Sequence, residues 1–371
     1  MDLMHYEYLN SSADPETFGR ALLSGTYDFV PDHFSWNAAI DFDQQRGDLL
    51  QPIAPGNVEN VTTLSTGPTL RGELFGAMDT ELDGHYERAY YSGNSVDNQT
   101  VGGKLKLGRR SGPKSRFGLG GSIDDVSYLG GPLSSALDFQ RSEAFLYGDL
   151  NGARTDFSAE LGYSQADGES FSGEGPLARL RLERKMSPDL SGFLGFRLEY
   201  PTSQQGLSVS DPTPSGGGIV NTSLVTSSPR QAQTGELGFN YSRTRSQASI
   251  GIYRLDEKSL IAALGHHTYD ELRASVTRTF TPLARGTLYA SYSKEDFSAA
   301  AQKYDEVRGG AVFAYDFTRS VGIDVRIEYQ ERNADGNNSS YNEFNGGVFL
   351  RYSGSLLGRN TATSSGIPLV R

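Results

Sequence analysis

Residues 345–352 have the sequence NGGVFLRY, in which large apolar side chains stand at every second position, at Val348, Leu350 and Tyr352. Gly347, which precedes Val348, and Arg351, which lies between Leu350 and Tyr352, are small or polar. In an extended strand this alternation places one row of side chains against an apolar medium and the other row against water. The stretch therefore predicts an amphipathic strand near the end of the chain.

The same strand resembles the closing strand that bacterial outer-membrane barrels present to their assembly machinery. That signal has the order polar, any residue, glycine, any two residues, hydrophobic, any residue, aromatic. It is matched here by Asn345, Gly347, Leu350 and Tyr352. The resemblance implies that these four residues are an assembly signal, that this strand closes a barrel, and that the preceding chain forms pairs of amphipathic strands.

Amphipathic segments recur along the whole chain. The clearest covers residues 321–330, where Val321, Ile323 and Val325 alternate with Gly322 and Asp324. A period of two over such a segment is typical of strands with one apolar face. Between the segments lie eight tight turns rich in Gly, Pro, Asn, Asp or Ser, which we place at Val30–His33, Gly76–Asp79, Ser111–Pro113, Asn151–Gly152, Ser187–Asp189, Thr244–Ser246, Thr281–Leu283 and Thr318–Ser320.

Eight turns join sixteen strands between Phe18 and Gln330. One more strand must lead into the first, with Leu3–Leu9 as the candidate, and one must follow the last, at Tyr341–Ser353. We therefore predict an all-β fold, a transmembrane antiparallel up-and-down β-barrel of about 18 strands over residues 1–353, with a periplasmic tail over residues 354–371. Because Leu3–Leu9 is short and alternates poorly, 16 strands is the alternative.

The connections at the other strand ends are longer. The longest, Thr202–Pro229, is rich in Ser, Gly, Thr and Pro and almost uncharged. Short turns on one side and long loops on the other are typical of bacterial barrels, whose short turns are periplasmic and whose long loops are extracellular. We expect Thr202–Pro229 to be either a lid or plug of the pore or a surface loop. Aromatic residues near both strand ends, such as Phe280 and Tyr329, predict two interfacial belts.

The composition excludes several other classes of protein. No apolar run approaches the roughly 20 residues of a membrane-spanning helix, and the absence of Cys excludes disulfides and thiolate metal sites. The net charge of −11 argues against a nucleic-acid partner. His266-His267 has no further ligand at metal-binding spacing, and no histidine lies in a nucleophile motif, although His85 is placed to face the lumen. We therefore predict no metal, no cofactor and no enzymatic activity.

The beginning of the chain shows no signal peptide, since Met1–Met4 is neither basic nor followed by an apolar stretch. An outer-membrane protein requires one, and we take the numbering to begin near the mature chain.

A barrel with this alternation has a polar interior. The residues that the pattern turns inward carry both signs of charge, and a network that fills the lumen and a conducting path are equally compatible with them. The predicted pore-lining residues are Lys104, Lys106, Arg179, Arg181, Arg197, Glu199, Asp324, Arg326 and Glu328.

The first third of the chain resembles the β-barrel porin 2 family of bacterial outer-membrane barrels, some of which are linked to exopolysaccharide and PEP-CTERM gene clusters. The resemblance covers about residues 20–130; the remainder matches in architecture only. It is carried by Tyr27, Pro31, Phe34-Ser35-Trp36, Pro55, Asn57, Asn60, Thr66-Gly67-Pro68 and the strand around Tyr86.

The resemblance implies an outer-membrane outlet for a secreted polysaccharide that works with a periplasmic polysaccharide export protein. We therefore expect a monomer in the bacterial outer membrane, in contact with membrane lipid and lipopolysaccharide, that exports exopolysaccharide or capsular polysaccharide. The alternatives are a diffusion porin for small solutes and, less favoured, an outer-membrane barrel enzyme or a structural adhesin.

Overall fold

The computed structural model describes residues 2–6, 16–46, 58–74, 78–93, 96–112, 114–130, 134–201, 220–221, 229–261, 265–298, 302–318, 320–335 and 340–352. Almost all of them lie in strands. The elements are β1 (Asp2–Tyr6), β2 (Glu16–Val30), β3 (Phe34–Arg46), β4 (Val58–Leu74), β5 (Met78–Tyr91), β6 (Asp97–Arg110), β7 (Ser115–Leu129), the 3-10 helix η1 (Ser134–Leu137), β8 (Phe139–Asn151), β9 (Thr155–Gly168), β10 (Ser172–Lys185), β11 (Leu190–Glu199), β12 (Val220–Asn221), β13 (Arg230–Arg243), β14 (Ser246–Ser259), β15 (His266–Thr281), β16 (Ala284–Phe297), β17 (Gln302–Asp316), β18 (Val321–Asp335) and β19 (Tyr341–Tyr352).

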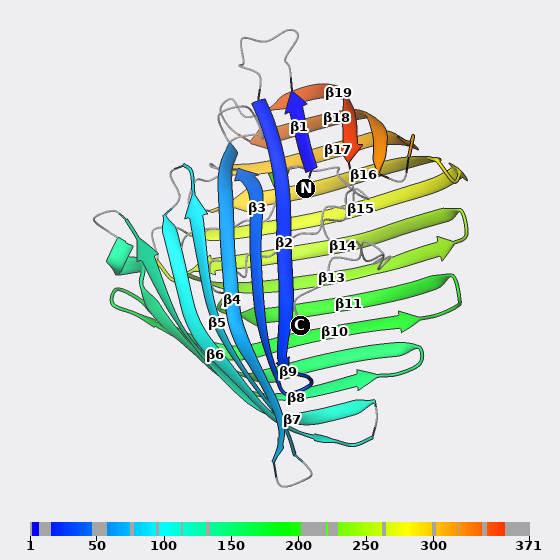
Figure 1. Ribbon diagram of the computed structural model, residues 1–371. Helices are drawn as coiled ribbons and strands as arrows, with labels where there is room; N and C mark the ends of the chain where they lie inside the picture. Colours follow the sequence, from blue (N-terminus) through cyan, green and yellow to red (C-terminus); the bar gives the residue numbers. More distant parts are fainter. Residues whose placement is uncertain are drawn as a thin grey trace.

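Each long strand pairs in antiparallel fashion with the next, so that the chain forms one up-and-down sheet. Of the nineteen strands, only the two-residue β12 stands outside this order, and β11 pairs directly with β13. The other eighteen confirm the predicted strand number. The sheet curls round until its first and last strands, β1 and β19, come into contact (Figure 1).

The short turns lie where the sequence predicts them. Each of the eight predicted turns coincides with a point where one strand ends and the next begins, along one edge of the sheet. In the first, the amide of His33 donates to the carbonyl oxygen of Val30 at 3.0 Å, and Asp32 has a φ of 64°. Aspartate tolerates this left-handed conformation better than most residues do, so its place in the turn has a physical reason.

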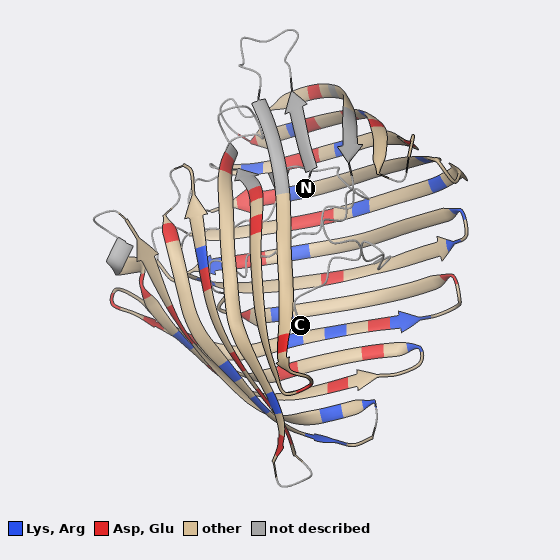
Figure 2. Ribbon diagram, in the orientation of Figure 1, with Lys and Arg blue, Asp and Glu red and all other residues tan. Residues whose placement is uncertain are grey.

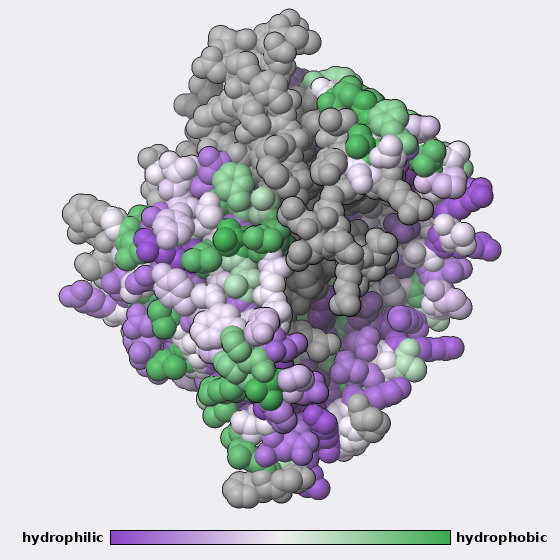
Figure 3. All heavy atoms as spheres, in the orientation of Figure 1, coloured by the Kyte–Doolittle hydropathy of each residue, from purple (hydrophilic) through white to green (hydrophobic). Residues whose placement is uncertain are grey.

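The two faces of the sheet differ in chemistry. On β18, Val325 and Ile327 are 41% and 49% exposed, whereas Asp324 and Arg326, which alternate with them, are 9% and 7% exposed. The exposed row is the outer face, and large hydrophobic side chains gather on the outer surface of the molecule (Figure 3). Charged residues lie along the strands as well as at their ends (Figure 2). An apolar outer face and a polar inner face are typical of a membrane β-barrel.

The last strand follows the predicted alternation. Phe344 and Val348 of β19 are 70% and 66% exposed, and β19 pairs Leu350 with Ile323 and Tyr352 with Val321 of β18. The role of Asn345, Gly347, Leu350 and Tyr352 as an assembly signal stays a prediction.

Two strand boundaries bear on the prediction. The first strand covers Asp2–Tyr6, and residues 7–9 of the predicted strand Leu3–Leu9 lie outside the described residues. The connection between β9 and β10 is short, because β9 continues to Gly168 and β10 begins at Ser172. The backbone pairing of β9 and β10 continues through polar residues such as Asp167 and Ser172 at the strand ends. These residues lack the apolar alternation by which a strand is recognised in the sequence. The tail over residues 354–371 lies outside the described residues.

Two described residues lie within the longest loop. Val220 and Asn221 form β12, which pairs in parallel with Gln44 and Gln45 at the long-loop end of β3. β3 is eight positions along the sheet from β11, after which this loop begins. The loop therefore contacts a distant wall of the barrel at residues 220–221. The rest of residues 202–228 lies outside the described part, and the lid stays a prediction. Among the described residues, no helix is long and apolar enough to cross a membrane.

Candidate functional site

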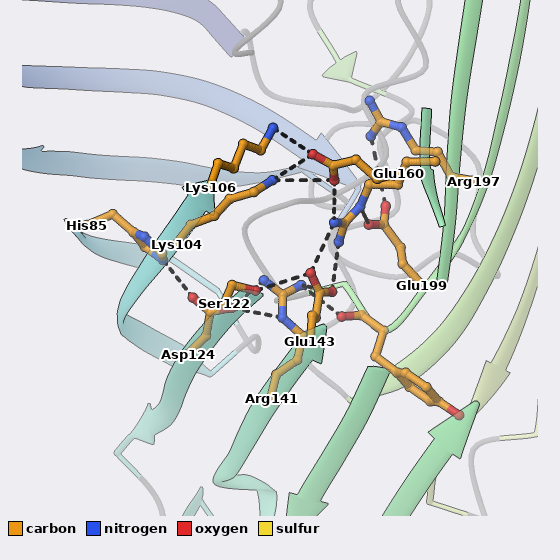
Figure 4. Close-up of polar contacts among 12 residues, drawn as sticks. His85, Lys104, Lys106, Ser122, Asp124, Arg141, Glu143, Glu160, Arg197 and Glu199 are labelled. Carbon is orange, nitrogen blue, oxygen red and sulfur yellow. Dashed lines mark hydrogen bonds and ion pairs between the residues drawn. The ribbon is translucent and has the colours of Figure 1, made fainter. Parts of the chain in front are cut away.

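Arg179 on β10 is the centre of an ion-pair network on the inner face, and Figure 4 labels its partners Glu143, Glu160 and Glu199. Its guanidinium binds one glutamate from each of three strands: Nη2 lies 2.8 Å from Glu143 Oε1, Nη1 lies 3.0 Å from Glu160 Oε2, and Nε lies 2.5 Å from Glu199 Oε2. The side chains of Glu143 and Glu199 are 2% and 5% exposed. A planar guanidinium with five N–H donors can hold several carboxylates at once. The network therefore ties together the inner faces of β8, β9, β10 and β11.

Glu160 extends this network to β6. The Nζ atoms of Lys104 and Lys106 lie 3.0 and 2.8 Å from Glu160 Oε1. The same ammonium groups lie over aromatic rings, Lys104 at 4.9 Å from the centroid of Phe145 and Lys106 at 5.1 Å from that of Tyr147. Such cation–π contacts are favourable, so both lysines are held by a carboxylate and a ring together.

Glycines on neighbouring strands make room for these rings. A methyl group at Gly120 would lie 2.3 Å from Cε2 of Phe145, and one at Gly108 would lie 2.0 Å from Oη of Tyr147. Each ring therefore covers a glycine, and a larger residue there would push the ring inward. Gly120 thus lies on the inner face beneath the ring of Phe145.

His85 belongs to a second part of the network, nearer the long-loop end. Its Nε2 lies 2.9 Å from Oδ1 of Asp124, whose side chain is fully buried. The other carboxylate oxygen of Asp124 accepts from Nε of Arg141 at 2.9 Å, and Nη1 of Arg141 donates to the carbonyl oxygen of Tyr200 at 2.9 Å. His85 thus lies on the inner face, where the sequence places it, and the last bond fixes the chain just after β11.

Tyr128 and Tyr200 correct the prediction of an aromatic belt at the long-loop ends. Both are 4% exposed and belong to an inner hydrophobic cluster with Phe139 and Phe171. The sequence places them near strand ends but does not reveal that the loops around them pack inward. Tyr90 and Tyr329, which are 40% and 41% exposed, do lie on the outer face.

The opposite part of the sheet has its own polar groups. The hydroxyl of Tyr289 on β16 donates to Glu328 Oε2 at 2.5 Å, and Nη2 of Arg332 lies 2.8 Å from Glu306 Oε2. Asp324 and Arg326, also on β18, are nearly buried. The predicted pore-lining residues Asp324 and Arg326 of β18 are thus covered by other side chains. They lie many strands away from the predicted pore-lining residues of β6 to β11.

His267 is held by carboxylates that are distant in sequence. Its Nδ1 lies 3.2 Å from Glu257 Oε2 on β14, and its Nε2 lies 3.1 Å from Glu295 Oε1 on β16. The sequence reasoning missed these partners because strand pairing brings them beside the histidine. Arg230 also binds Glu257, at 2.6 Å. His267 therefore belongs to a series of ion pairs that runs across neighbouring strands. Over the described residues, no group of three or more side chains is arranged to hold a metal ion.

The nine predicted pore-lining residues all lie on the inner face, but their surroundings differ. Lys104, Lys106, Arg179 and Glu199 belong to the Arg179 network. Arg181 and Arg197 are the exposed members, with Arg197 at 50%. Figure 4 shows Arg197 extending beyond Glu199 at the margin of the network. An exposed side chain on the inner face must border solvent inside the barrel, so Arg181 and Arg197 mark an open part of the lumen.

The inner face also separates the two signs of charge. The described inner-facing side chains of β2 to β5 include one arginine, Arg71, and one histidine, His85. The same inner faces carry nine carboxylates, those of Asp28, Asp41, Asp43, Glu59, Glu73, Asp79, Glu81, Asp83 and Glu87. The exposed arginines lie on β10 and β11, seven or eight positions along the sheet from β3. The sequence predicts that both signs of charge face the interior, and the structure shows that they are unevenly distributed. The inner face of β2 to β5 forms an acidic wall, and the exposed arginines lie on the opposite wall.

Comparison with solved structures identifies outer-membrane transporter folds. The FrpB iron transporter of Neisseria meningitidis (F5-1 variant, apoprotein form) superposes with a TM-score of 0.54 at 11% identity, over 90% of this chain and 63% of that one. The siderophore receptor PirA of Acinetobacter baumannii gives a TM-score of 0.53 at 13% identity, over 91% of this chain and 65% of that one.

The chain spans less than two thirds of the length of either of these two structures. No protein-family model and no curated protein matches the sequence. At these identities the likeness concerns the fold, and it agrees with the apolar outer face of the sheet. The chain has the fold of a bacterial outer-membrane β-barrel.

Proposed function

We propose that the chain is an outer-membrane pore through which an exopolysaccharide or capsular polysaccharide leaves the cell. The observation that carries the proposal is the exposed pair Arg181 and Arg197 on the inner face. Asn37, on the inner face of β3, is exposed as well. Strands eight positions apart in an eighteen-stranded barrel lie on nearly opposite sides, so these residues border an aqueous passage between β2–β3 and β10–β11.

The rest of the inner face supports a passage with firm walls. Most inner charges, such as Arg179 and Asp124, are bound to other wall residues and are unavailable to a solute. Polymer movement requires groups that form hydrogen bonds with sugars without holding them tightly, because conduction fails when binding is too strong for release. The wall formed by β6 to β11, where most charged side chains are paired with one another and few polar groups are exposed, meets this requirement.

The choice of polysaccharide rests on the resemblance of residues 20–130 to the β-barrel porin 2 family. On the same basis we propose a contact with a periplasmic polysaccharide export protein. The closing-strand signal of residues 345–352 supports a contact with the barrel assembly machinery, and the outer-membrane location supports one with lipopolysaccharide. The second candidate is uptake of a small solute. It is favoured by the structural neighbours, which are named as an iron transporter and a siderophore receptor.

Deletion of the gene distinguishes the two candidates. We expect the deletion strain to lose its surface polysaccharide, measured by sugar analysis of the extracellular fraction, and to retain normal uptake of small sugars and of iron. A plasmid-borne copy should restore the polymer. Normal polysaccharide together with impaired uptake would contradict export and support the second candidate.

A further inference from the structure

Arg181, Arg197 and Glu236 lie around Gly195 on the inner wall, and we propose that they form a subsite for a sugar unit that carries a carboxylate. The inference rests on the proposed function, because it assigns the class of polymer that the pore carries: an acidic polysaccharide.

The register of three strands brings these residues together. Arg181 on β10 pairs with Gly195 on β11, and Gly195 pairs with Glu236 on β13; Arg197 is two residues further along β11, on the same face. A methyl group at Gly195 would lie 2.5 Å from both Cγ and Oε1 of Glu236. The glutamate side chain therefore lies over the glycine, next to the positions of both arginines.

The charged side chains of Arg181, Arg197 and Glu236 have no close ion-pair partner among the described residues of the barrel wall. Within the described part of the chain, neither Arg181 nor Glu236 forms an ion pair, and the one ion-pair partner of Arg197 is Glu199 at 4.0 Å. Glu199 is already bound to Arg179 at 2.5 Å. This contrasts with Lys104, Lys106 and Arg179, whose partners lie within 3.0 Å. The subsite thus carries a net charge of +1 and faces the lumen.

An aromatic ring borders the subsite on the side of the short turns. A methyl group at Gly238 would lie 2.5 Å from Cζ of Phe193, so this ring covers Gly238 next to the subsite. Tyr253 pairs with Glu236 on the other side. Polar groups beside aromatic side chains are the usual composition of sites for small organic ligands, and the apolar face of a sugar ring packs well against an aromatic face.

The chemistry favours an acidic sugar over a neutral one. A guanidinium binds a carboxylate through two parallel hydrogen bonds, a geometry that a hydroxyl group cannot match. Glu236 can accept hydrogen bonds from the hydroxyl groups of the same or the next sugar. Because both arginines are exposed to water, their attraction for the ligand is weakened, and the sugar unit can leave as the polymer advances.

The test measures block of the ionic current in planar bilayers by two oligomers of equal length, hexagalacturonate and maltohexaose. At low salt we expect hexagalacturonate to block wild-type protein at a concentration at least tenfold lower than maltohexaose does. The double variant R181Q/R197Q should lose this preference, and high salt should reduce it. R71Q is the matched control, because Arg71 is an inner-face arginine with the same 50% exposure that is paired with Glu81 on the acidic wall.

Equal block by the two oligomers, or an unchanged preference in R181Q/R197Q, would overturn the subsite and leave the pore intact. A calorimetric titration of the detergent-solubilised barrel with hexagalacturonate tests the subsite without any need for conduction. Binding that is lost in R181Q/R197Q would support the subsite even in a barrel that carries no current, in which case the proposed export function would fail alone. Absence of binding to wild-type protein would refute the subsite.

Discussion

Replacement of Arg179 by Met should destabilise the barrel by about 3 kcal/mol. Breaking a buried ion pair by removing one partner costs about 3–5 kcal/mol, because the remaining charge is left uncompensated. Arg179 is 20% exposed, which places the expected cost at the lower end, but it serves three carboxylates at once. The free energy of unfolding in urea, measured with the barrel refolded into lipid vesicles, gives the value.

Two further variants identify the cause of this loss. Arg181→Met changes an exposed arginine of the same strand and face, and it should alter the stability by less than about 0.5 kcal/mol. Adding Glu143→Gln and Glu199→Gln to Arg179→Met should recover part of the loss, since two of the uncompensated charges disappear. An equal loss in Arg179→Met and Arg181→Met would show that the network does not stabilise the wall.

Replacement of Val325 by Arg should cost about 2–4 kcal/mol, because it places a charge against the hydrocarbon of the membrane. Val325 lies on the outer face of β18 between Val321, next to a short turn, and Tyr329 near the other membrane interface. The expected result is poor assembly into vesicles, measured as the fraction that resists unfolding when unheated samples are run in gel electrophoresis.

Thr63→Arg provides the control for Val325→Arg. Thr63 lies on the inner face of β4 and pairs with Asp41 on the acidic wall, so the same new charge meets water and carboxylates there. This variant should assemble like the wild type. If both variants assemble equally well, the assignment of inner and outer faces is wrong.

The strand order and the two faces could be predicted from the sequence because both are local properties. A period of two fixes which side chains share a face, and turn residues mark one edge of the sheet. On this basis alone the nine residues from Lys104 to Glu328 are expected on the inner face, where the structure has them, and their role in lining a pore stays a prediction.

The pairing of charges within the lumen could not be predicted in the same way. Lys104 and Glu160 are 56 positions apart in sequence and three strands apart in the sheet, and their contact depends on the register of every strand between them. The inward rings of Phe145 and Tyr147 were missed because the glycines that accommodate them belong to other strands. For the same reason, the sequence could not indicate that Arg179 pairs with three glutamates. Nor could it indicate that Arg181, two residues away, is exposed.

The central claim is that a water-filled passage runs along the inner face beside Arg181 and Arg197. Its most direct test is the single-channel conductance of the purified barrel in planar bilayers in concentrated KCl. We predict stepwise, long-lived increases in current, and a change in ion selectivity toward cations in R181Q/R197Q, because two positive charges are removed from the passage. A correctly assembled barrel that gives no current steps would contradict the claim.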